Sequence, residues 1–113
     1  MAMIDNVFLG TTIKLALSAT GTPSVKMSDC NFDVFVWSAS SNDAYSNKPD
    51  SAFHLTKAEC ITEDDNTYIA AVPTDEIGKG YVITRLVIFI EDTDCANGLR
   101  KEVLQALPNI KIV

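Results

Sequence analysis

Residues 91–103, EDTDCANGLRKEV, carry the side chains best suited to binding a metal ion. Calcium loops place carboxylates at alternate positions so that several oxygens point at one ion. The EF-hand spacing fails in both registers, however. Counted from Asp92, Ala96 takes the third ligand position and Val103 the twelfth, and a shift by one residue makes Thr93 and Cys95 ligands. We predict a turn between two strands, with an irregular calcium site as the alternative.

Read as a turn, the same residues have other roles. Asp92 and Asp94 are expected to bond nearby backbone N–H groups at a strand end. The Asn97-Gly98 pair is expected to supply the positive φ angles of a tight turn. Arg100 would then pair with one of the aspartates, an exposed contact of about 0–1 kcal/mol that fixes the loop shape.

The remaining reactive side chains show no catalytic arrangement. The single histidine, His54, lies in a strand-like stretch, and no nucleophile elbow or glycine-rich phosphate loop occurs. The cysteines, Cys30, Cys60 and Cys95, lack the short paired spacing of structural zinc sites, although His54 could complete such a set. We predict a protein that is not an enzyme and has no cofactor or metal.

Composition limits the class of partner. The chain has 113 residues, which favours one domain, and a net charge of −6 with a pI near 4.5. An acidic chain without a basic cluster is not expected to bind nucleic acid or anionic membranes. No signal peptide is evident at the N-terminus, and the longest apolar run, residues 86–90, is far too short to span a bilayer.

The chain reads as strands separated by polar turns. Apolar residues alternate over residues 13–20, and further strands are predicted at 31–40, 52–62, 67–73, 81–92, 99–106 and 109–113. One helical turn is expected at 74–81, with Thr74 or Asp75 as its N-cap. We predict an all-β fold, a single immunoglobulin-like antiparallel β-sandwich of about seven strands. Residues 13–113 form this sandwich, and the apolar residues 1–12 form an N-terminal docking arm.

Two motifs carry a resemblance to a known family. IGKG at 77–80 and DTDCANGLR at 92–100 flank a long apolar strand. This pattern, over residues 50–113, resembles β-sandwich modules in virion proteins of tailed bacteriophages. These include the N-terminal module of upper-baseplate-type proteins and related modules in phages of Bacteroides-like hosts. There the module opens a longer protein and attaches a fibre or receptor-binding part. This chain ends at Val113, so it resembles the attachment module alone, which implies a small adaptor or decoration subunit.

The resemblance implies a structural protein of the virion, made in the cytoplasm of a bacterial host. We expect an accessory capsid subunit, a head fibre or decoration protein, that forms dimers or trimers and contacts the capsid shell. The expected docking residues are Val7, Phe8 and Leu9, and the expected interface residues are Phe35, Trp37 and Tyr45. Alternatives are a tail baseplate or fibre adaptor, and a carbohydrate-binding module that stacks Trp37, Tyr45 and Tyr68 on sugar rings.

Overall fold

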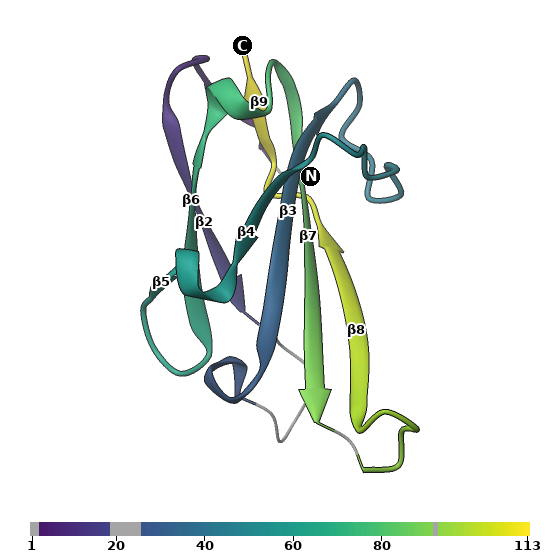
Figure 1. Ribbon diagram of the computed structural model, residues 1–113. Helices are drawn as coiled ribbons and strands as arrows, with labels where there is room; N and C mark the ends of the chain where they lie inside the picture. Colours follow the sequence, from purple (N-terminus) through teal and green to yellow (C-terminus); the bar gives the residue numbers. More distant parts are fainter. Residues whose placement is uncertain (1–2, 19–25, 92) are drawn as a thin grey trace.

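The computed structural model describes residues 3–18, 26–91 and 93–113, which form two packed β-sheets (Figure 1). The larger sheet has the order β1-β9-β7-β3-β4, with β8 also paired to β7, and the smaller has the order β2-β6-β5. The strands are β1 (Asp5–Val7), β2 (Thr12–Ser18), β3 (Asn31–Ala39), β4 (Phe53–Thr56), β5 (Ile61–Thr62), β6 (Thr67–Pro73), β7 (Gly80–Glu91), β8 (Leu99–Ala106) and β9 (Ile110–Ile112). The predicted all-β sandwich is confirmed.

Short 3-10 turns interrupt the strands at η1 (Met27–Asp29), η2 (Lys57–Glu59) and η3 (Thr74–Glu76). The helical turn expected at 74–81 is therefore present as η3. Its N-cap is Pro73, without a side-chain cap bond, so neither Thr74 nor Asp75 caps it. Within the described ranges, no helix is long and apolar enough to cross a membrane.

The smaller sheet follows the alternation of the sequence. In β2, Ile13, Leu15 and Leu17 are buried, and the residues between them are exposed. Leu15 pairs with Ala70 of β6, and both face the larger sheet. This period of two is what a strand with one solvated face requires.

The larger sheet is buried on much of both faces. Val34 of β3 pairs with Leu86 of β7 on the inner face, where both belong to the core. Val87 and Ile83, on the outer face of β7, are also buried. This apolar strand is therefore covered on both sides for much of its length.

The last strand is broken where the sequence predicted. Thr84 pairs with Ala106 but Tyr81 pairs with Lys111, so the edge strand carries two extra residues around Pro108. Asn109 adopts a positive φ of 60° in this bulge. As a result β8 and β9 are successive parts of one edge of β7.

The N-terminal segment departs from the purely antiparallel prediction. Residues 5–7, predicted to be part of a separate docking arm, form β1, which pairs with β9 in a parallel register from Asp5↔Ile110 to Val7↔Ile112. This pairing and the turn η2 inside the 52–62 run raise the strand number above the predicted seven.

The sheet order matches the immunoglobulin arrangement. Strands β2, β6 and β5 take the positions of B, E and D, while β3, β7 and β8 take those of C, F and G. In that arrangement a strand A lies beside B. Within the described part of the chain, β2 has no neighbour on that side.

Candidate protein interaction surfaces

The predicted docking residues lie at one end of the sandwich, next to the C-terminus. Val7 is half-buried against the core, whereas Phe8 is 77% exposed and Leu9 43% exposed. Backbone bonds hold the segment in place, from Val113 N–H to Val7 O at 2.8 Å and from Leu9 N–H to Val113 O at 3.1 Å. The structure therefore presents Phe8 and Leu9 to solvent from a fixed backbone.

Thr74 ties this segment to the sandwich. Its side chain is fully buried, and its hydroxyl donates to Thr11 O at 2.7 Å and accepts from Gly10 N–H at 2.9 Å. Thr74, expected as a possible helix N-cap, has this role instead. The bonds span more than sixty residues in sequence, and no local pattern encodes them.

Phe35 lies on the outer face of the larger sheet beside His54. The two rings stack with centroids 4.6 Å apart, and the ammonium of Lys48 lies 4.9 Å from the Phe35 centroid. His54 Nε2 is 3.0 Å from Asp33 Oδ1. His54 is thus held between the ring of Phe35 and the carboxylate of Asp33.

Trp37, a predicted interface residue, is covered by its own subunit and is 3% exposed. Its indole N–H donates to Ser46 Oγ at 3.1 Å, and the Arg85 guanidinium lies 5.5 Å from its ring. The loop 40–52 therefore lies over the ring. Tyr45, in the same loop, is 91% exposed, so the loop covers Trp37 and leaves its own Tyr45 in solvent.

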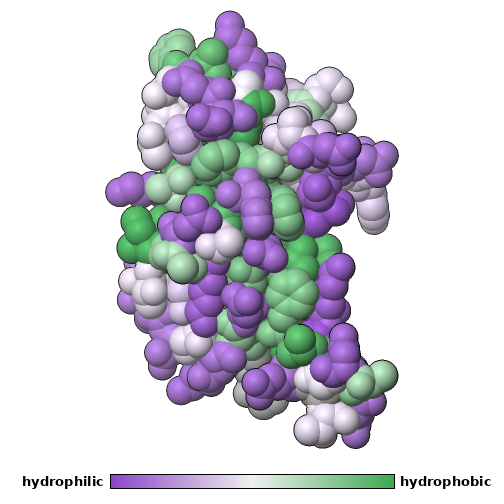
Figure 2. Space-filling view, viewed as in Figure 1, coloured by the Kyte–Doolittle hydropathy of each residue, from purple (hydrophilic) through white to green (hydrophobic). Residues whose placement is uncertain are grey.

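The lower half of the outer face remains open. Figure 2 shows hydrophobic surface over β7 and β8 there, with hydrophilic side chains around it. Val103 is 50% and Leu99 45% exposed on β8, and Phe89 is half-buried on β7. The strand registers place these three side chains on one face. Val103 and Leu99 are not among the predicted interface residues, although the alternation within LRKEVLQA places them on one face of a strand.

Charges around this apolar surface are separated by sign. One hollow, lined by Phe35, Val87, Phe89 and Val103, has Lys48, Arg85, Lys101 and Asp33 around it. The adjoining hollow, lined by Phe89 and Leu99, has Asp29, Asp33 and Glu91 around it. The surface therefore has a mainly basic end and an acidic end.

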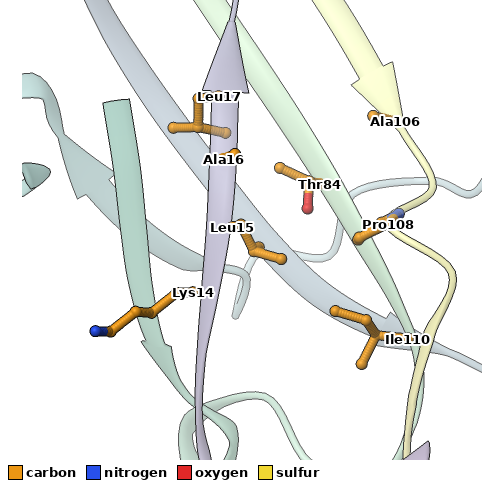
Figure 3. A pocket seen from close by; sticks show the side chains of 8 residues that line it. All are labelled: Lys14, Leu15, Ala16, Leu17, Thr84, Ala106, Pro108 and Ile110. Atoms are coloured by element: carbon orange, nitrogen blue, oxygen red, sulfur yellow. The ribbon is translucent and has the colours of Figure 1, made fainter. Parts of the chain in front are cut away.

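A second apolar surface lies at the open side of the sandwich, between β2 and the β8–β9 edge (Figure 3). The hollow there has a volume of about 290 Å³. Figure 3 shows Leu15, Thr84 and Ile110 pointing into it, while Lys14 points away. Thr84 Oγ1 is buried and has no hydrogen-bond partner among the described groups.

The described residues contain no group of three His, Cys, Asp or Glu side chains that could hold a metal ion. Cys30 is buried, Cys60 and Cys95 are half-buried, and all three are free thiols. Burial raises the pKa of both the Cys30 and Cys60 thiols. Such thiols are poor nucleophiles because the thiolate is the reactive form.

The turn at 92–98 differs in part from the prediction. Asp92 lies outside the described residues. Gly98 has the expected positive φ of 75°, but Asn97 does not, since Asn109 is the one described non-glycine residue with positive φ. Asn97 instead accepts the Leu99 N–H through Oδ1 at 3.2 Å, and Arg100 Nε lies 3.5 Å from Glu102. The pairing of Arg100 with an aspartate stays a prediction.

No family model matches this chain, and neither does any curated protein or solved structure. The resemblance to phage β-sandwich modules therefore stays an expectation from the turn and strand residues of the sequence.

Proposed function

We propose that this protein is a non-enzymatic structural subunit of a tailed bacteriophage particle, an accessory capsid protein of the head fibre or decoration type. The observation that carries the proposal is the exposed apolar surface on β7 and β8, formed by Phe89, Leu99 and Val103. An apolar patch with a polar rim is typical of a protein–protein interface.

This surface suits contact with a second copy of the chain. A two-fold axis that lies in the plane of this face, perpendicular to the line from its basic to its acidic end, would place the basic end, with Lys48 and Arg85, opposite the acidic end, with Asp29 and Glu91. Complementary charge fixes register more than it adds affinity, and the apolar centre supplies the affinity. The predicted interface thus shifts from Trp37 toward Phe89, Leu99 and Val103.

The end of the sandwich that carries Phe8 and Leu9 is the proposed contact with the capsid shell. Both side chains are exposed beside Val113, and the bonds of Thr74 hold their backbone in place. A tail baseplate or fibre adaptor would use the same end, so this surface does not separate head from tail.

Most of the aromatic surface expected in the carbohydrate-binding alternative is buried. Trp37 is 3% and Tyr68 4% exposed, so neither ring can stack on a sugar in this conformation. Tyr45 alone remains exposed among the three predicted stacking residues.

Gradient-purified phage particles test the structural role. Mass spectrometry is expected to find the protein in particles, and antibody labelling to place it on the head; absence from particles, with the protein abundant in the lysate, would refute the role. Phe8→Asp is expected to reduce incorporation into particles. Its control is Thr62→Asp, an exposed change on β5, which pairs with the opposite end of β6.

The self-association is tested on purified protein by light scattering. Val103→Glu places a charge in the centre of the proposed interface and is expected to yield monomers, whereas Val103→Thr, of similar size, keeps the assembly partly intact. Monomeric wild-type protein at tens of micromolar would contradict the proposed contact.

A further inference from the structure

The turn between β7 and β8 contains the one Asn-Gly pair of the chain, Asn97 and Gly98. Both residues are exposed. In such a pair the side-chain amide of asparagine is open to attack by the next backbone nitrogen, because glycine has no Cβ to obstruct the approach. The pair therefore has a reactivity beyond its part in the turn.

The surroundings of Gly98 leave room for this attack. Gly98 has a φ of +75°, and apart from its chain neighbours no heavy atom lies within 4 Å of the position that a Cβ would take. A backbone that closes a ring with its own side chain must change shape locally. Around Gly98 this change would meet open space.

A hydrogen bond of Asn97 orients and polarises the group under attack. Its Oδ1 accepts the Leu99 N–H at 3.2 Å. Negative charge develops on this oxygen when Cγ becomes tetrahedral, and a donor already aimed at such an oxygen stabilises the transition state. The Leu99 amide is thus placed to act as that donor.

One contact opposes the reaction. The Gly98 N–H donates to Cys95 O at 2.9 Å, and this bond must open before the nitrogen can turn toward Cγ. A solvent-exposed bond in a turn opens by local fluctuation, without unfolding of the sheet. The bond therefore slows the attack but does not prevent it.

We propose that Asn97 is a site of spontaneous deamidation. The Gly98 nitrogen gives up its proton and attacks Cγ; the N–Cγ bond forms, the Cγ–Nδ2 bond breaks, and the departing nitrogen takes up a proton and leaves as ammonia. Water then opens the succinimide ring at either carbonyl, which leaves aspartate or isoaspartate at position 97. Water is the sole co-reactant, so the protein modifies itself.

The products change the start of β8. Both add a negative charge close to Leu99 and Glu91, which line the acidic hollow of the outer face and form the first pair between β7 and β8. Isoaspartate also inserts a methylene group into the backbone before Gly98, which lengthens the turn. The reaction is a property of this turn and does not depend on the proposed function.

Peptide mapping of aged protein tests the site. Folded protein is incubated in mildly alkaline buffer and digested in mild acid, which stops further reaction. The peptide with residue 97 is expected to gain the mass of an amide-to-acid conversion and to separate into two forms, one of them a substrate of isoaspartyl methyltransferase. Asn66 is the internal control, since it is also exposed in a turn between two strands but precedes the β-branched Thr67. An unmodified Asn97, or equally fast reaction at Asn66, would overturn the proposal.

Two variants identify the attacking nitrogen. Gly98→Ala keeps the asparagine and adds a Cβ beside the nitrogen, whereas Asn97→Gln keeps the glycine and requires a larger ring that closes more slowly. Each is expected to lower the rate of deamidation at position 97 about tenfold or more. Either variant reacting at the wild-type rate would show that Gly98 N is not the nucleophile and would overturn the proposal.

Discussion

Gln105 holds Arg85 on the outer face of the larger sheet: its Oε1 accepts hydrogen bonds from Arg85 Nε at 3.0 Å and Nη2 at 2.9 Å. The Nε2 of the same glutamine donates to the carbonyls of Ala44 at 2.7 Å and Ser46 at 3.0 Å. One side chain thus connects β7, β8 and the loop over Trp37. The separation of the apolar outer face into a covered upper part and an open lower part depends on this contact.

Gln105→Glu is expected to release the loop, because the carboxylate keeps the acceptor for Arg85 but would face two carbonyls without a donor. Gln105→Ala loses all four bonds and costs about 1–3 kcal/mol of unfolding free energy, the range for breaking such contacts. Trp37 is the one tryptophan in the chain, so its fluorescence emission reports directly on whether the loop 40–52 covers it. We expect a red shift and stronger acrylamide quenching in both variants. Lys101→Ala, on the same face of β8, is the control, and unchanged emission in Gln105→Ala would contradict the prediction.

Thr74→Val is expected to destabilise the fold by about 1–3 kcal/mol, because the buried hydroxyl bonds to Gly10 and Thr11 are lost while the shape is kept. Thr74→Ser retains the hydroxyl and is expected to lose less unfolding free energy than Thr74→Val. Urea unfolding curves give both values. Hydrogen exchange at the Gly10 amide is expected to accelerate in the valine variant, and equal stability of the two variants would exclude the proposed tie.

Gly80→Ala is expected to be more harmful than Gly98→Ala. An added Cβ at Gly80 would lie 2.8 Å from the Ala39 carbonyl oxygen, at a φ of +136°. Gly98 has a φ of +75° with open space around it, so its substitution costs about 1–2 kcal/mol from the left-handed backbone alone. We expect a larger fall in melting temperature for Gly80→Ala. A smaller or equal fall would mean that β3 and β7 separate easily at this end.

Acid is expected to weaken the turn η2 through Glu59. The Thr56 backbone N–H and hydroxyl, each 3.0 Å from Glu59 Oε1, and the nearby His54 hold the pKa of this carboxyl below its ordinary value of 4.5. A lowered pKa means that the ionised form stabilises the fold above pH 4.5 and that this stabilisation is lost as the pH falls. The melting temperatures of wild type and Glu59→Ala are expected to converge in acid. A constant difference between them down to pH 2–3 would contradict this linkage.

Cys30 is expected to resist alkylation in the folded protein. The thiol is 5% exposed, and burial raises its pKa above the ordinary value of 9.0, although Lys57 acts in the opposite direction. Iodoacetamide followed by peptide mapping should modify Cys30 only after unfolding in urea. Because the raised pKa favours the neutral thiol, the fold is expected to lose stability above pH 9 relative to Cys30→Ala. Rapid native-state labelling of Cys30 would contradict the observed burial.

The sequence by itself determined most of the strands and the face that each of these presents to the core. The 67–73 and 99–106 runs appear as β6 and β8 with those bounds, and the alternation of Ile13, Leu15 and Leu17 predicts their burial. Side chains alternate across a strand, so when one face of the strand meets water, an apolar period of two can be buried only by turning the apolar face toward the core. The predicted turn between two strands is likewise found at 93–98, between β7 and β8.

Only the tertiary structure decided how the second apolar face is used. Trp37 and Phe35 have the same parity in β3, yet a loop covers Trp37 while Phe35 remains at the surface. That difference depends on Gln105, which bonds to the covering loop from about sixty residues away in sequence. The position of the N-terminal segment depends on the parallel pairing of β1 with β9. Local periodicity encodes which side chains must leave water, but it does not encode which distant segment covers them.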